Sequence, residues 1–462
     1  MAYSLYFHIP FCSHRCAYCD FNTYACHEHL IPAYVEALVR EVGLVARASP
    51  QRVAVHSIFF GGGTPSLLSP AQFETILHSV RQNFDLVSVS SNPPSTSFPP
   101  TNRSSPSDFS SSLSTFGSSD SSNSLGAFGS SGTSGTSDTS DTSNPSSPEL
   151  SLEANPGTVS LAALQLLRQA GFNRISFGVQ SFHPTELRQL ERIHDPFDVY
   201  NAVRWARRAG FDNLNLDLIY GLPEQTLARW QANLERAVEL SPQHLSLYAL
   251  TIEPGTPYGR WSAHGLLPQP DPDLAADMYE WAADFLAGQG YEQYEISNWS
   301  KPGYQCRHNL QYWRNQPYLG FGAGAHGCAG GMRISNVLKI QSYLDRFIPL
   351  PSLPLPLSDV LFPFPISPAT RDQQPLTTFI EMQETMMLGL RLTREGVSAQ
   401  AFQDRFGQDV VAVFGRELDD LVRLGLLEHV SSPAGSAAGR LFRLTRRGRL
   451  LGNQVFMRFV GE

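Results

Sequence analysis

Short apolar runs alternate with amphipathic stretches along most of the chain. The apolar runs predict strands at Leu5–Ile9, Ser57–Phe60, Leu150–Glu153, Arg174–Gly178, Asn213–Leu218 and Leu245–Leu250. Helical periodicity follows several of these runs, at Pro32–Ala46, Leu161–Ala170 and Leu227–Leu240. Alternation of this kind predicts an α/β fold, with a parallel sheet covered by helices. Ligands of such folds bind at the carboxyl ends of the strands.

Two segments of biased composition interrupt this pattern. Residues 86–149 are dominated by Ser, Gly, Thr, Asn, Asp and Pro, which bury too little apolar surface to offset the cost of ordering the chain. We therefore expect a disordered surface insertion there; a regulatory phosphorylation tract is the alternative. Residues 347–375 are rich in proline, which excludes regular structure and predicts a linker. The core domain accordingly comprises residues 1–85 and 150–346.

The last part of the chain, residues 376–462, predicts a small helical domain of winged-helix character. Helices are expected at Thr378–Arg391 and Ala399–Leu427, and a strand at Leu441–Leu444 precedes a turn and a last helix. DNA binding is one interpretation of this domain. Its basic residues are few, however, which favours a lid or packing domain.

Composition narrows the class of protein. The chain has 462 residues and a net charge of −8, which argues against broad binding of nucleic-acid phosphates. No apolar run approaches the eighteen or so residues that would span a bilayer, and the N-terminus lacks the features of a signal peptide. We expect a cytoplasmic protein without a transmembrane segment.

The strongest chemical signal is a cysteine loop with the spacing Cys-x3-Cys-x2-Cys, formed by Cys12, Cys16 and Cys19. One short loop of this kind can hold three irons of a cubane cluster and leave the fourth iron open to another ligand. A disulfide framework would need a secreted, cysteine-dense chain, whereas this one has six Cys in 462 residues. Structural zinc would need a fourth ligand in a second pair, and none has that spacing.

A glycine turn, Gly61-Gly62-Gly63-Thr64-Pro65, follows the second predicted strand. Glycine lets the backbone approach a ligand closely, because it has no Cβ and tolerates positive φ. A tight turn or a phosphate loop is the alternative, although the Lys-Ser/Thr of a nucleotide P-loop is missing.

The cysteine loop and the glycine turn together resemble the radical S-adenosylmethionine (SAM) superfamily. More narrowly, they resemble the branch that contains oxygen-independent coproporphyrinogen III oxidase and the HemW-type haem chaperones. The resemblance implies a partial (β/α)6 barrel, a [4Fe-4S] cluster on Cys12, Cys16 and Cys19, and SAM chelating the fourth iron. It also implies a set of SAM-binding positions: Tyr6, Tyr18, Gly62, Gly63, Thr64, Glu153, Gln180, Arg192, Asp217, Ala249 and His326. Singly, such polar residues at strand ends are more often solvated or capping groups.

Within this branch, the resemblance favours the haem chaperone. The oxidase carries a further Cys two residues after its third ligand, where this chain has Phe21, and it has a longer N-terminal extension. The sequence His308-Asn309-Leu310-Gln311-Tyr312-Trp313 resembles a HemW motif. The resemblance therefore implies a protein that binds haem and transfers it to client haem proteins such as respiratory enzymes. Radical SAM decarboxylation of coproporphyrinogen III is the alternative, so enzymatic activity is left open, as is a homodimer.

Three side chains are candidate haem ligands. His308 could supply a neutral imidazole and Cys306 a thiolate, and His326 is a rival axial ligand. A histidine in a polar and aromatic loop is more often a hydrogen-bonded structural residue, and isolated cysteines are more often buried small apolar residues.

Overall fold

The computed structural model describes residues 2–88, 147–348, 362–431 and 439–460. Most of the predicted insertion, residues 86–149, lies outside this range. Among the described residues, none of the helices combines the length and apolar character that crossing a membrane requires.

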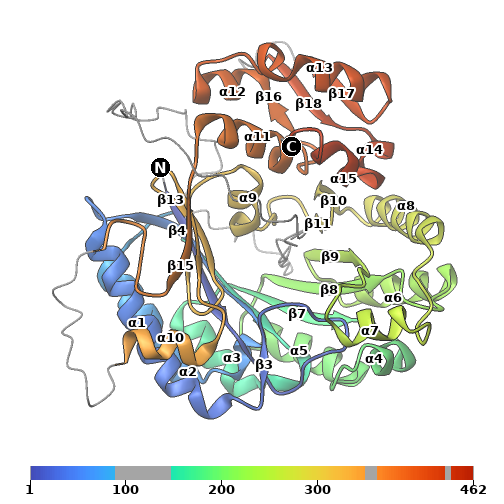
Figure 1. Ribbon diagram of the computed structural model, residues 1–462. Coiled ribbons are helices and arrows are strands. Elements are labelled where there is room, and N and C mark those ends of the chain that lie inside the picture. The colour runs from blue at the N-terminus through green and yellow to red at the C-terminus, as the bar shows by residue number, and fades with distance from the viewer. Residues whose placement is uncertain (1, 89–146, 349–361, 432–438, 461–462) are drawn as a thin grey trace, which may run out of the picture.

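Six parallel strands form the centre of the molecule (Figure 1). In spatial order they are β1 (Tyr3–Ile9), β4 (Ala54–Gly62), β6 (Glu149–Ala154), β7 (Arg174–Gln180), β8 (Leu214–Tyr220) and β9 (His244–Ala249). Each pairs in parallel with its neighbour. The six strands match the six predicted from the apolar runs, and the expected α/β class with a partial barrel is confirmed.

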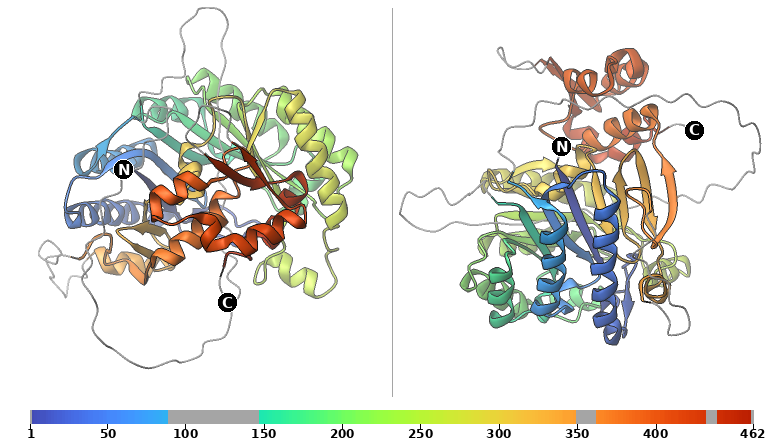
Figure 2. Two further views of the ribbon diagram at one scale, coloured as in Figure 1. Left: turned by 90° about the horizontal axis from the view of Figure 1, so that it is seen from above. Right: turned by 90° about the vertical axis from the view of Figure 1, so that its left-hand side faces the viewer.

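Helices cover the outer face of these strands. Figure 2 shows them following one another around the outside of the sheet, from blue through green to yellow. They are α1 (Ile31–Ala48), α2 (Pro70–Asn83), α3 (Leu161–Ala170), α5 (Pro196–Arg208), α6 (Leu227–Glu239) and α8 (Pro272–Gly288). Their apolar faces and the outward side chains of the strands form one large core.

Short elements lie in the connections between the strands and helices. They are β2 (Phe11–Cys12), β3 (Tyr24–Ala25), β5 (Asp85–Leu86), α4 (Pro184–Gln189), α7 (Pro257–Ala263) and the 3-10 turns η1 (Glu28–Leu30), η2 (Pro65–Leu67) and η3 (Pro156–Thr158).

Further strands extend the sheet at both ends. Beyond β1 follow β12 (Tyr318–Phe321), β13 (His326–Ala329), β14 (Met332–Asn336) and β15 (Thr370–Pro375), and beyond β9 follow β11 (Asn298–Ser300) and β10 (Glu292–Glu295). Helix α10 (Ile340–Phe347) follows β14.

Strand β15 corrects the prediction that residues 347–375 have no regular structure. It pairs with β14 over five residues, so the core sheet continues past the expected boundary at residue 346. The strand is almost wholly exposed and has its one proline at its end, which is the place an edge strand allows.

The C-terminal domain has the expected winged-helix character. It contains α11 (Thr378–Gly389), β16 (Val397–Ser398), α12 (Ala399–Phe406), α13 (Val410–Arg423), β17 (Leu427–Ser431), β18 (Arg440–Leu444), α14 (Arg446–Leu450) and α15 (Gly452–Phe456). One predicted helix, Ala399–Leu427, is in fact two helices, because Gly407 ends α12 in the left-handed conformation and Asp409 caps α13. β17 was not predicted.

The domain packs on the barrel rather than over the cysteine loop. In Figure 1 it lies above the barrel, whereas β3, which follows the cysteine loop, lies at the bottom. Several of its arginines pair within the molecule: Arg446 with Asp284 at 2.8 Å and Arg443 with Glu428 at 2.7 Å. Such pairs agree with the packing interpretation and leave less charge for a nucleic acid.

Helix α9 (Arg307–Trp313) lies between the C-terminal domain and the barrel (Figure 1). Asn315, just after this helix, donates hydrogen bonds to the Glu381 carbonyl and the Thr385 hydroxyl of α11, at 3.2 and 3.1 Å. Arg314 forms an ion pair with Glu395 at 2.7 Å.

Candidate functional site

The cysteine loop leaves the barrel at the carboxyl end of β1, where β2 carries Cys12. Cys12 is buried, while Cys16 and Cys19 are partly exposed. The amide of Cys19 donates to the Cys16 carbonyl at 3.1 Å, which closes a tight turn between these two residues. The loop thus places its sulfurs at the end of the sheet where ligands of this class of fold bind.

The thiols are electrostatic neighbours. Burial, with smaller contributions from the charges of Cys16 and Cys12, raises the pKa of Cys19 to about 11. Burial also raises the pKa of Cys12, against a hydrogen bond from the Thr64 hydroxyl at 3.6 Å. In the described part of the chain, no three His, Cys, Asp or Glu side chains close around a single metal ion. An iron-sulfur cluster fits these three thiols better than a single metal ion does, because a cluster is larger and its ligands are further apart.

The glycine turn holds the start of the cysteine loop. The amides of Gly63 and Thr64 donate to the carbonyls of Ile9 and Phe11 at 2.8 and 2.7 Å. A Cβ on Gly63 would come within 2.5 Å of the Phe11 carbonyl oxygen, so only glycine fits there. The turn and the cysteine loop are therefore one structural unit.

Two carboxyl groups lie inside the barrel near this turn. Glu153 accepts the amide of Gly62 at 3.1 Å, and Asp217 accepts the Ser176 hydroxyl at 2.7 Å. Burial raises the pKa of Asp217 to about 6, and burial together with the charge of Asp217 raises the pKa of Glu153. The two groups, 64 residues apart in the chain, thus share one low-dielectric site.

Arg192 joins the cysteine loop to the end of β7. Its Nη1 lies 3.5 Å from the sulfur of Cys16, and its Nη2 donates to the Gly178 carbonyl at 2.8 Å. Gln180, which has a positive φ of 66°, also reaches over Gly178. Among the described residues, the buried Nε of Arg192 has no hydrogen-bond partner. A guanidinium with a free N–H suits a carboxylate ligand.

The structure brings together most of the other expected positions. Tyr6 lies inside the barrel with its hydroxyl 3.0 Å from Nδ1 of His8. Tyr18 contacts Tyr258 edge to face and lies near Arg192. Ala249 is exposed at the carboxyl end of β9.

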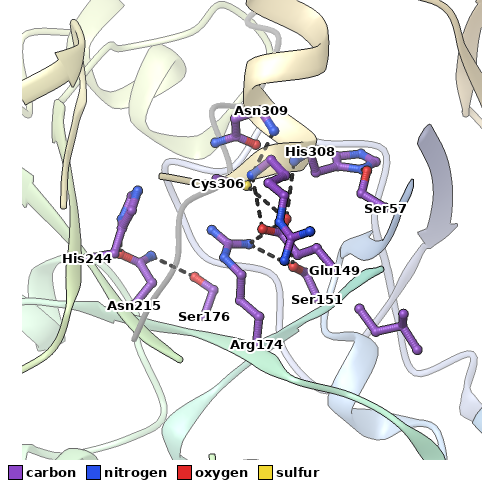
Figure 3. Close-up of polar contacts among 12 residues, drawn as sticks. Ser57, Glu149, Ser151, Arg174, Ser176, Asn215, His244, Cys306, His308 and Asn309 are labelled. Carbon is purple, nitrogen blue, oxygen red and sulfur yellow. Dashed lines mark hydrogen bonds and ion pairs between the residues drawn. The ribbon is translucent and has the colours of Figure 1, made fainter. Parts of the chain in front are cut away.

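Cys306 and His308 are placed differently, at the amino ends of the strands on α9 (Figure 3). Both are wholly buried. The ring nitrogens of His308 lie 3.0 Å from the Ser57 hydroxyl and 2.9 Å from the Tyr312 hydroxyl. The Cys306 sulfur caps α9 by accepting the Asn309 amide at 3.3 Å. In this arrangement neither side chain can reach haem iron without giving up these contacts.

Glu149 and Arg174 were missed in the sequence. Glu149 accepts the amides of Arg307 and His308, at 3.0 and 3.2 Å, and lies 4.0 Å from Arg174 (Figure 3). Charge from Arg174 and Arg307 holds the pKa of Glu149 below its usual value, although burial alone raises it. A lone Glu at the end of a serine-rich segment gives no local signal for this role.

His326 lies on β13 and is exposed. No hydrogen bond or ion pair involves its side chain among the described residues, in contrast to His308. Partial desolvation of its ring and the charge of Arg333 lower its pKa, which favours the neutral imidazole.

Comparisons with known proteins agree with this arrangement. The model of the radical SAM superfamily matches residues 6–101 and 138–237, and that of the HemN C-terminal domain matches residues 381–451. Haem chaperone HemW of Bacillus subtilis is 34% identical over 460 residues, which cover 99% of each chain. Haem chaperone HemW of Escherichia coli is 37% identical over 329 residues, covering 70% of this chain and 69% of its own. The solved structure of coproporphyrinogen III oxidase HemN from Escherichia coli, a radical SAM enzyme, has the same fold, with a TM-score of 0.69, 23% identity, and coverage of 99% of this chain and 90% of that one.

Proposed function

The chain belongs to the HemW family of haem chaperones within the radical SAM superfamily, and from this premise we propose that it binds haem and delivers it to client haem proteins. The observation that carries the proposal is similarity to HemW over 99% of both chains. Respiratory enzymes are the clients we propose. HemN shares the fold, but fold alone does not assign its activity.

Phe21 supports the carrier over the oxidase. It follows the third cysteine of the loop by two residues and is 37% exposed. It offers no thiol where the oxidase carries one, and a partly exposed aromatic side chain suits contact with a porphyrin plane.

The superfamily implies a [4Fe-4S] cluster and SAM. We propose Cys12, Cys16 and Cys19 as the cluster ligands, because all three lie in the loop that follows β1, burial and the charge of Cys16 raise the pKa of both Cys12 and Cys19, and the Arg192 guanidinium lies beside Cys16. When bound, the reduced cluster would supply an electron to SAM.

The proposed SAM site lies between the cysteine loop and the strand ends. Arg192 would bind a carboxylate through its free N–H, and Glu153 and the glycine turn would orient polar groups of SAM. The proposed contacts are Tyr6, Tyr18, Gly62, Gly63, Thr64, Glu153, Gln180, Arg192, Asp217 and Ala249; His326, the remaining position that the resemblance implies, is assigned separately below.

The function is tested by anaerobic incubation of the cluster-loaded protein with coproporphyrinogen III, SAM and a reductant. We expect no vinyl product by mass spectrometry and stoichiometric haem binding in a parallel titration. Formation of the vinyl product would establish the oxidase instead.

The cluster ligands are tested separately. Iron content after anaerobic reconstitution should fall in Cys12→Ala, Cys16→Ala and Cys19→Ala, and stay at the wild-type level in Cys26→Ala. Cys26 is the matched control, because it is an exposed cysteine seven residues beyond the third ligand. Full iron content in any of the first three variants would remove that residue from the set.

A further inference from the structure

Four histidines lie near β1, and in the described part of the chain His326 alone has no hydrogen-bond partner at either ring nitrogen. The Nε2 atom of His56 lies 3.3 Å from the Ser4 hydroxyl and 2.9 Å from Oε1 of Gln311. His308 is held by Ser57 and Tyr312. His8 is held by the Tyr6 hydroxyl at 3.0 Å and the Asn22 carbonyl at 2.9 Å. His326 has no such partner in the described part of the chain and is exposed.

Strand register places the His326 side chain on the face that lines the barrel. Ser4 of β1 pairs with Tyr318 of β12, and Tyr318 pairs with Cys328 of β13. Paired residues share a face, and so do residues two apart on one strand, so His326 faces the same side as Cys328, Ser4 and Tyr6.

The His326 backbone lies directly against β12. Gly320 of β12, which pairs with Tyr6, packs directly against the His326 backbone, and a Cβ there would lie 1.9 Å from the His326 carbonyl oxygen. Only glycine fits at position 320, so this close contact fixes the place of the His326 backbone on the sheet.

Two neighbouring polar groups on this part of the sheet already have partners. Ser335, opposite His326, donates to Asp372 at 3.0 Å, and Arg333 forms an ion pair with Glu384 at 2.6 Å. Among the described residues, the His326 imidazole and the Cys328 thiol have no hydrogen-bond partner, and burial raises the pKa of Cys328, which disfavours the thiolate that binds iron.

Apolar side chains are exposed nearby. Asn22 packs against Gly324, two residues before His326, and donates to the Leu338 carbonyl at 3.0 Å. This contact brings together two loops that expose Phe21, at 37%, and Leu338, at 46%. Exposed apolar groups beside a free imidazole match a porphyrin, whose plane is apolar and whose iron takes a nitrogen ligand.

We propose that His326 is the protein ligand to the iron of bound haem, with the macrocycle edge near Phe21 and Leu338. This assignment rests on the proposed haem carriage. With this assignment, His326 is no longer a proposed SAM contact, because a free imidazole binds iron well but interacts only weakly with the sulfonium cation of SAM. His308 remains a structural residue of α9.

Haem titration of the full-length protein tests the site, followed by the Soret band and by the spin state of ferric haem. His326→Gln should weaken haem binding at least about tenfold and abolish the histidine-ligated spectrum. The matched controls Ser335→Ala and Cys328→Ser, on the same face, should keep both. His308→Gln should keep the spectrum if it folds, as judged by circular dichroism.

Imidazole rescue provides a second readout. Millimolar imidazole should restore the histidine-ligated spectrum of haem bound to His326→Gly. The proposed site would be wrong if His326→Gln kept the wild-type spectrum and affinity, or if Cys328→Ser lost them. Either result would leave the proposed function as a haem carrier untouched. Wild-type protein that takes up no haem would instead overturn the proposed function, and this site with it.

Discussion

The buried pair Glu149–Arg174 provides the sharpest stability prediction. Glu149 is 3% and Arg174 1% exposed, and Glu149 also accepts two amides at the start of α9. Glu149→Gln keeps the size of the side chain but removes the negative charge that lies 4.0 Å from the buried Arg174 guanidinium. Removing one partner of a buried pair costs about 3–5 kcal/mol. We expect a loss of that size in the free energy of unfolding of the core.

The pair also fixes a pH dependence. The folded pKa of Glu149 lies below its unfolded value, so the carboxylate contributes stability that is fully present above the unfolded pKa. That stability is lost as the pH falls from the unfolded pKa through the folded one. Glu149→Gln should therefore lose less stability than wild type on acidification below about pH 4.3, the ordinary pKa of Glu.

Urea unfolding of the cluster-free protein measures the loss, and hydrogen exchange at the amides of Arg307 and His308 locates it. The matched control is Glu74→Gln, which breaks the exposed pair with Arg81 at 2.6 Å and should cost at most about 1 kcal/mol. Equal losses in the two variants, or unchanged exchange at the two α9 amides in Glu149→Gln, would refute the reasoning.

Three further predictions concern the candidate site. Gly63→Ala should lose most of the cluster iron, because its Cβ would meet the Phe11 carbonyl. Gly288→Ala, where a Cβ meets nothing within 4 Å, should keep its iron. The iron content of both variants after reconstitution tests this prediction. Arg192→Met should weaken SAM binding about 10- to 100-fold, since a hydrogen bond to a charged group contributes about 1.5–3 kcal/mol. Calorimetric titration with SAM measures this affinity. An affinity equal to that of the wild type would show that Arg192 does not bind SAM. The folded pKa of Asp217 is raised to about 6, so protonated Asp217 stabilises the fold fully below about pH 3.9, and this stability is lost as the pH rises through 6. The melting temperature of the wild type should therefore fall over this pH range, and it should fall less in Asp217→Asn. An unchanged pH profile in the variant would contradict the assignment.

The parallel strands could be predicted because each is a short apolar run buried on its outer face. The cysteine loop could be found because three cysteines lie within eight residues. Strand β15 could not, since an exposed edge strand of polar residues carries no apolar pattern.

Long-range pairing explains what was missed at α9. Glu149 meets Arg307 and His308, which lie 158 and 159 residues further along the chain. The motif around His308 was visible, but its burial depends on Ser57 and Tyr312 being brought to both sides of the ring. The availability of His326 likewise follows from the register of β12 and β13, which no local pattern reveals.

Haem transfer tests the central claim most directly. The cluster-loaded protein, saturated with haem and freed of excess, is mixed with an apo-cytochrome, and the spectrum of the acceptor is followed over time. Excess apomyoglobin, which traps released haem, measures the rate of spontaneous release from the protein. Transfer to the apo-cytochrome should be faster than this rate, and the donor should return to its haem-free spectrum. Haem that stays on the protein, or moves no faster than it is released spontaneously, would contradict a role as a haem carrier.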